Sequence, residues 1–243
     1  MSFLKIASLT CIALTLGACQ SLFQPATQKP LEFKRDAWEQ VKPGCNDPDC
    51  PLVNIDTVHF PSEPQLDSLI ERRLLQMTQA TPLPTSLKAY QDQFLATSAS
   101  RQGSYLQAKV LEQHDGLVII ELISYLDNGT PQGTPSRSFI NWSREEHKAL
   151  TLQDILLPGQ EEAFWKLVRV AHNSWQINNR VDQDFVRTWP FQTTPNVALT
   201  SDGVLLKYNV TTIAPYAMGL IDLKVDYSRL NGILKPERFP ARQ

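Results

Sequence analysis

One short segment of this chain alternates strictly between apolar and charged residues. The apolar positions are Ile221, Leu223, Val225 and Tyr227, and the charged positions between them are Asp222, Lys224 and Asp226. Because successive side chains of a β-strand point to opposite faces, the segment predicts a strand with one face in a core and the other in water. Strands of this kind are typical of antiparallel sheets. We therefore expect part of the chain to form an antiparallel sheet that is covered on one face.

Three other segments carry apolar residues at the three- and four-residue intervals of an amphipathic helix, namely 66–77, 87–95 and 164–175. Further strand patterns are present at 106–110, 117–125, 138–142, 195–200 and 204–212. Asp115-Gly116, between the first two of these strands, is a hairpin turn signal. Clustered helices beside hairpins, rather than alternating β-α-β units, indicate an α+β fold in which helices pack on an antiparallel sheet.

The N-terminal residues have the pattern of a bacterial lipoprotein signal. Lys5 precedes the apolar run 6–16, and Gly17-Ala18-Cys19 follows it. The run is shorter than the roughly 20 residues that span a bilayer. Cleavage before Cys19 would leave a thiol that can carry diacylglycerol, and two or more acyl chains hold a protein stably at a membrane. We interpret residues 1–18 as a lipoprotein signal peptide and Cys19 as the lipidated N-terminus.

The charge and the residue after Cys19 bear on location and partners. In Gram-negative lipoproteins an aspartate at that position favours the inner membrane, so Gln20 predicts an outer-membrane lipid anchor with the domain facing the periplasm. Loss of Lys5 with the signal peptide leaves 22 basic and 25 acidic side chains, a net charge of −3. Nucleic-acid binding needs a strongly basic surface, so we expect no nucleic-acid partner.

Residues 19–51 are predicted to form a lipidated tether, because prolines and polar residues dominate this stretch. The tether would hold the folded body, residues 52–234, clear of the membrane. Residues 235–243 carry two prolines and mixed charge and are expected to be a loose tail. On this interpretation a chain that begins near Pro43 keeps the stability of the longer form.

Cys45 and Cys50 are the two cysteines that remain after processing and lipidation. In an oxidising compartment a close pair favours a disulfide. A metal site is the alternative, but it needs two more ligands, and His59 is the only histidine nearby. We expect the disulfide to shape the loop where the tether meets the folded body.

The sequence carries no recognisable catalytic motif. His59, His114, His147 and His172 are widely spaced and form no metal-binding pair. There is no Gly-x-Ser-x-Gly elbow and no glycine-rich phosphate loop. We therefore expect no enzymatic activity, no catalytic residue, no metal and no cofactor. A pair of carboxylates placed as in a glycosidase is the remaining alternative, since it depends on distance in space rather than on sequence spacing.

Three segments together resemble a known family. They are the stretches 149–156, 198–206 and 213–219, which read ALTLQDIL, ALTSDGVLL and IAPYAMG. They are similar to the extracytoplasmic domain of the RsiV anti-sigma factor, which is also found in the N-terminal part of PdaC-type peptidoglycan deacetylases. The resemblance implies an α+β domain over 52–234, helical in its first part and sheet-rich in its second. Family members often carry a Gly-Ala-His-type turn before the third strand, where this chain has Gly133-Thr134-Pro135.

The resemblance also implies a function. It points to a non-catalytic envelope lipoprotein that binds a lysozyme-type muramidase or peptidoglycan. The alternatives are a structural or assembly lipoprotein and an unrecognised cell-wall hydrolase. The candidate binding residues are Tyr216 and Met218, which suit interface anchors, and Trp189, an aromatic residue just before Pro190.

The first prediction concerns the anchor. Cys19→Ala removes the thiol that carries the lipid, so the variant is expected to lose palmitate labelling and to remain unprocessed or soluble. Cys11→Ala, a change within the segment that is removed, should leave labelling intact. Membrane partitioning and labelling that survive in Cys19→Ala would contradict the lipoprotein interpretation.

Overall fold

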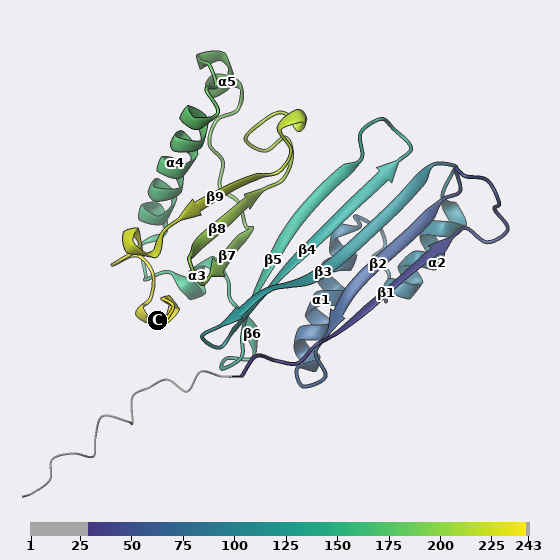
Figure 1. Ribbon diagram of the computed structural model, residues 1–243, viewed down its shortest axis with the longest axis horizontal. Coiled ribbons are helices and arrows are strands. Elements are labelled where there is room, and N and C mark those ends of the chain that lie inside the picture. Colours follow the sequence, from purple (N-terminus) through teal and green to yellow (C-terminus); the bar gives the residue numbers. More distant parts are fainter. Residues whose placement is uncertain (1–28, 242–243) are drawn as a thin grey trace, which may run out of the picture.

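The protein is built from two sheets with helices packed against them (Figure 1). The structure is a computed structural model, and it describes residues 29–241. Cys19 and the signal peptide expected at residues 1–18 lie outside the described residues. The mixed architecture is the α+β fold that the sequence predicts. Within the described part of the chain, none of the helices is both long and apolar enough to cross a membrane.

The larger sheet has six strands in sequence order. They are β1 (Lys34–Val41), β2 (Leu52–His59), β3 (Gln102–His114), β4 (Leu117–Asn128), β5 (Thr134–Ser143) and β6 (Lys148–Ala149). Neighbours are antiparallel except β2 and β3, which pair in parallel. A parallel pair needs a long crossover. The crossover here consists of α1 (Pro64–Met77) and α2 (Leu87–Thr97), which cover one face of the sheet (Figure 1).

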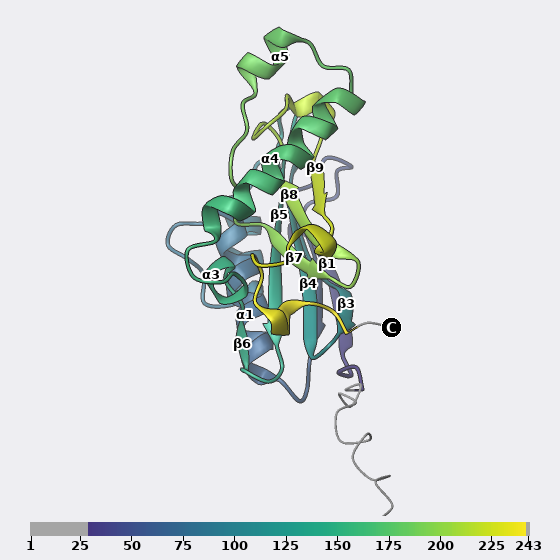
Figure 2. The same ribbon diagram turned by 90° about the vertical axis from the view of Figure 1, so that its left-hand side faces the viewer.

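The smaller sheet has three antiparallel strands, β7 (Val197–Thr200), β8 (Gly203–Tyr208) and β9 (Ile221–Val225). It is preceded by α3 (Leu152–Ile155), α4 (Glu161–Asn178) and α5 (Gln183–Thr188). Phe164 and Val168 of α4 are buried with the apolar positions of β9 in one core. Figure 2 shows α4 crossing this sheet on the side nearest the viewer. The predicted alternation is confirmed for β9, since burial switches at every residue from Ile221 to Val225, but the strand ends there and Tyr227 lies in a 3₁₀ turn.

Three single-turn 3₁₀ helices complete the second half of the chain. They are η1 (Tyr216–Met218), η2 (Tyr227–Arg229) and η3 (Pro236–Arg238). η1 lies in the connection between β8 and β9, inside the Ile213–Gly219 segment that resembles the family. Gly219, which ends η1, has a φ of 70°, a conformation that glycine adopts without the strain a Cβ would add.

One buried amide joins the two sheets. The side chain of Asn141, on β5, donates from Nδ2 to the carbonyl of Val197 (2.8 Å), and its Oδ1 accepts from the backbone N–H of Leu199 (2.8 Å). Both backbone groups belong to β7, the edge strand of the smaller sheet. The amide therefore satisfies polar groups that would otherwise be buried without partners, and it fixes β7 against β5.

The expectation that residues 19–51 form only a tether is wrong for residues 34–41. These residues form β1, which pairs with β2 along its whole length. Trp38 also donates from Nε1 to the side chain of Gln91 on α2 (2.7 Å). β1 is an edge strand that is exposed along most of its length, so it lacks the apolar alternation by which strands are recognised. Within residues 52–234, the part expected to be helical begins with a strand, β2, and the part expected to be sheet-rich also contains the long helix α4.

The predicted disulfide between Cys45 and Cys50 is present, but its expected place is wrong. It closes the turn between β1 and β2, at the far end of β1 from Lys29. Within this turn the carbonyl of Asp49 accepts a hydrogen bond from the backbone N–H of Arg101 (2.7 Å). The disulfide therefore shapes a turn that docks onto the start of β3, and not the entry of the tether.

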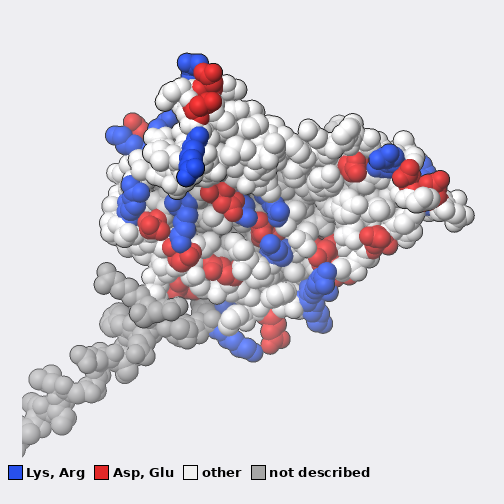
Figure 3. Space-filling model, turned by 45° about the horizontal axis from the view of Figure 1, so that its top comes forward, with Lys and Arg blue, Asp and Glu red and all other residues white. Residues whose placement is uncertain are grey.

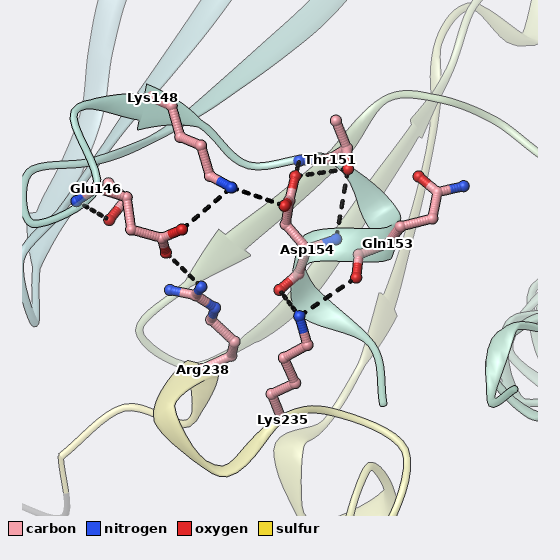
Figure 4. A network of polar contacts seen from close by, with 8 residues as sticks. Glu146, Lys148, Thr151, Gln153, Asp154, Lys235 and Arg238 are labelled. Carbon is pink, nitrogen blue, oxygen red and sulfur yellow. Dashed lines mark hydrogen bonds and ion pairs between the residues drawn. The ribbon is translucent and has the colours of Figure 1, made fainter. Parts of the chain in front are cut away.

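The C-terminal tail, expected to be loose, is packed as far as Phe239. Arg238 pairs with Glu146 (2.5 Å), and Lys235 donates from Nζ to the carbonyl of Asp154 (2.9 Å), as Figure 4 shows. Phe239 packs against Tyr227, with ring centroids 5.7 Å apart. Two prolines do not prevent packing here, because they occupy a 3₁₀ turn and an extended segment rather than a helix interior.

The structure reverses the prediction about truncation. A chain that begins at Pro43 loses β1 and exposes both the edge of β2 and Gln91. We expect such a chain to melt about 4–8 °C below a chain that begins at Lys29, the shift that about 2 kcal/mol produces in a domain of this size. Trp38→Ala in the longer chain should account for part of the loss. Equal melting temperatures in calorimetry would show that β1 adds nothing to the fold.

Candidate functional site

The structure places Tyr216 and Met218 in η1 and Trp189 at the end of α5. The hydroxyl of Tyr216 donates to the carbonyl of Gly133 (2.9 Å), at the turn between β4 and β5. Met218 packs against the core of the smaller sheet. Tyr216 is therefore a bridge between the two sheets as well as a half-buried surface residue, whereas Trp189 belongs to a separate element.

Two further tyrosines lie on the adjoining sheet. Tyr105 of β3 and Tyr125 of β4 are directly opposite each other in the antiparallel ladder, and their ring centroids are 5.9 Å apart. Ser104 and Leu106, which flank Tyr105 on β3, point to the helix side. There Ser104 accepts a hydrogen bond from Tyr90 of α2. By the alternation of a strand, Tyr105 and Tyr125 lie on the face that the helices leave open.

Each of these two rings lies against a glycine. A Cβ added to Gly133 would lie 2.8 Å from Cε2 of Tyr125, and one added to Gly103 would lie 3.1 Å from Cε2 of Tyr105. The glycines thus let both rings lie close along the backbone. Tyr105 remains 40% exposed. Tyr125 and Tyr216 both contact Gly133, and Tyr105 lies beside Tyr125, so we call these three tyrosines the tyrosine face.

Polar side chains of β1, β2 and β3 continue this open face. Asp56 accepts from Nε of Arg35 (2.6 Å) and from Nε2 of Gln107 (2.7 Å). The hydrogen bond from Arg35 is the main reason that the pKa of Asp56 lies below its usual value. Glu39 accepts from Nδ2 of Asn54 (3.0 Å) in the same way. The open face therefore carries fixed amide and carboxylate groups next to exposed aromatic surface.

A buried carboxylate lies where the open face meets the smaller sheet. Glu121 of β4 contacts Lys109 (2.8 Å), Lys207 (2.9 Å) and Arg137 (3.5 Å), which come from β3, β8 and β5. Its side chain is only 1% exposed. Burial raises the pKa of Glu121, but hydrogen bonds from Lys109 and Lys207 outweigh it and hold the pKa below its usual value. The carboxylate is thus ionised and fully engaged, so it joins the sheets rather than offering a free acid or base.

The sequence predicts no metal-binding pair among the four histidines. His59, His114, His147 and His172 come from different elements, and in the described residues no three His, Cys, Asp or Glu side chains are placed to hold a metal ion. His172 is buried beside Trp175, and burial is the main reason that its pKa is lowered. Lys and Arg alternate with Asp and Glu over the surface seen in Figure 3, with no extended patch of one sign.

The sequence singles out Tyr216 as a candidate but not Tyr105 or Tyr125. The alternation of the two strands indicates which residues share a face, but not which face the helices cover. The contact of Tyr105 with Gly103 is local to β3, whereas the contacts of Tyr125 with Tyr105 and with Gly133 arise only when β4 pairs with β3 and β5.

Comparisons with known proteins agree with this fold. Residues 153–228 match a family described as "Protein of unknown function (DUF3298)". A crystal structure of a DUF3298 family protein from Pseudomonas aeruginosa PAO1 has 58% sequence identity and a TM-score of 0.85, covering 88% of this chain and 99% of that chain. A DUF3298 member from Bacteroides fragilis NCTC 9343 shares the fold at 18% identity and a TM-score of 0.66, covering 85% of this chain and 94% of that one. No curated protein matches significantly. The chain belongs to the DUF3298 family.

Proposed function

We propose that this protein is a non-catalytic, lipid-anchored binding module of the bacterial envelope whose ligand is the glycan of peptidoglycan. The observation that carries the proposal is the tyrosine face, in which two rings lie against Gly103 and Gly133 on an open sheet. Aromatic rings held in this way offer flat apolar surface together with hydroxyl groups at their edges.

The surroundings of the rings suit a sugar. A pyranose ring has apolar C–H faces that can stack on an aromatic ring, and hydroxyl groups around its rim. Asp56, Glu39 and the amides of Asn54 and Gln107 supply donors and acceptors beside the rings, and their mutual hydrogen bonds hold them in place. A face whose side chains are already ordered loses little conformational entropy on binding.

The location rests on the lipoprotein signal, with Cys19 as the proposed anchor. The 58% identical relative comes from Pseudomonas aeruginosa, a Gram-negative organism, which supports an outer-membrane anchor facing the periplasm. The resemblance to RsiV and to PdaC-type deacetylases also points to the envelope and to cell-wall ligands.

Binding to isolated peptidoglycan sacculi tests the proposal. Tyr105→Ala removes the more exposed ring, so we expect it to weaken binding about tenfold, the effect of about 1.4 kcal/mol. Tyr105→Phe keeps the ring and should retain most of the affinity. Leu83→Ala, which removes an exposed apolar side chain from another part of the surface, is the matched control.

Gly133→Ala gives an independent check without altering a tyrosine. The added Cβ would force the ring of Tyr125 from its place, so binding should fall while the variant still folds. The proposal would be contradicted if the wild-type protein does not bind sacculi, or if a folded Tyr105→Ala variant binds them with unchanged affinity. Release of soluble muropeptides by the wild-type protein would instead support the cell-wall hydrolase alternative.

A lysozyme-type muramidase is the second candidate ligand, favoured by the resemblance to RsiV. The net charge of −3 would attract a cationic muramidase, although such a field is weak.

We expect Tyr216→Ala to reduce muramidase affinity by about 1–2 kcal/mol, as a modest hot spot does. Calorimetric titration measures this, and a melting curve must show that the variant is folded. A folded variant with unaltered affinity would place the interface elsewhere. Binding of neither muramidase nor sacculi would leave a structural or assembly role.

A further inference from the structure

A groove lies on the helix side of the larger sheet, away from the tyrosine face. It runs between α1 and the turn that links β5 to β6, and its volume is about 520 Å³. Its lining residues are Pro64, Gln65, Ser68, Leu69, Arg72, Trp142, His147, Lys148 and Ala149. This open groove has room for part of a small ligand.

One residue that lines the groove carries a buried donor without an acceptor. Trp142 is 2% exposed, and its Nε1 has no hydrogen-bond partner within residues 29–241. A buried N–H left in this state costs about 1–3 kcal/mol. The nitrogen has less than 1 Å² of exposed surface. An acceptor in the groove can therefore reach it only when a side chain of the groove wall moves aside.

A cation lies in the same groove. Arg72 is exposed on α1, and within the described residues its guanidinium has neither an ion pair nor a hydrogen bond. A guanidinium presents a planar set of donors that matches a carboxylate in a two-point contact. Arg72 and the indole of Trp142 thus supply donors of the kind that one carboxylate group accepts.

The opposite wall of the groove is held rigidly. Lys148 lies between Glu146 (3.1 Å) and Asp154 (2.9 Å), and Glu146 also pairs with Arg238 of the C-terminal segment (Figure 4). The charge of Lys148 is therefore largely compensated, which leaves Arg72 as the main cation available to a ligand. The nearby carboxylate of Glu63 is likewise engaged, by His147 (3.2 Å).

We propose that this groove binds the free carboxylate end of a short peptide. Arg72 takes the carboxylate, the indole N–H of Trp142 adds a further donor, and Leu69, Pro64 and Ala149 contact a small apolar side chain. Because the groove is open to solvent, the peptide can be the end of a longer chain. One available guanidinium favours a ligand with a single carboxylate at this point.

An NMR titration of the ¹⁵N-labelled mature protein tests this site. The chain has five tryptophans, so their indole N–H signals are few, and Trp142→Phe identifies the relevant one. The probes are N-acetyl-alanyl-alanine and the same dipeptide with a C-terminal amide. We expect the acid to shift the Trp142 indole signal saturably, and the amide to leave it in place.

Two neighbouring arginines provide the matched variants. Arg72→Gln should weaken binding of the acid at least about tenfold, the usual scale for losing a charged two-point contact. Arg73→Gln removes an adjacent exposed arginine that does not line the groove and should bind as the wild type does. The rest of each spectrum reports whether the variant is folded. The proposal is overturned if the Trp142 signal does not move at millimolar acid, if the acid and the amide act alike, or if both arginine variants lose affinity equally.

Discussion

The arrangement of this molecule depends on polar groups that are buried between its two sheets. Asn141 makes two hydrogen bonds to the backbone of β7, and Glu121 is surrounded by basic side chains from three strands. Buried groups of this kind are costly unless they are fully paired, so they tolerate few alternative registers. Breaking a buried ion pair by removing one partner typically costs about 3–5 kcal/mol. The same joint brings η1 against the β4–β5 turn, and it therefore determines where the hydroxyl of Tyr216 meets the carbonyl of Gly133.

Successive side chains of a strand point to opposite faces of the sheet, and this alternation determines on which face each candidate site lies. Tyr105 and Tyr125 occupy positions that point away from the helices, whereas Trp142 occupies a position of β5 that points toward them. The two candidate sites thus lie on opposite faces of the larger sheet. The backbone of the sheet and the core beneath α1 and α2 separate them. Since the sites share no side chain, substitutions at one are expected to leave the energetics of the other nearly unchanged.

The sequence predicts elements well where burial imposes a period. The alternation at Ile221–Val225 and the helical spacing in α4 both identify elements with one buried face. The sequence predicts an element poorly where that element lies at the edge of a sheet. β1 has mostly exposed side chains on both faces, so no apolar pattern marks it, and its pairing with β2 comes from backbone groups that every sequence possesses. The residues of the candidate sites also differ in how far the sequence indicates them. Tyr216 is identifiable from its proline-containing turn, but the contact of Tyr125 with Gly133 depends on the geometry of the β4–β5 hairpin, and the unsatisfied indole of Trp142 depends on packing in the folded chain.

The point at which the described chain enters the fold has a mechanical consequence. The carbonyl of Lys29 accepts a hydrogen bond from Arg144 (2.9 Å), directly after the end of β5. Gly133 lies just before the other end of that strand, about 35 Å away at the rise of an extended strand. The segment from Cys19 to Lys29 can span at most about a further 35 Å. If Cys19 carries the lipid, as we propose, these two lengths together limit how far from the membrane surface the tyrosine face can reach.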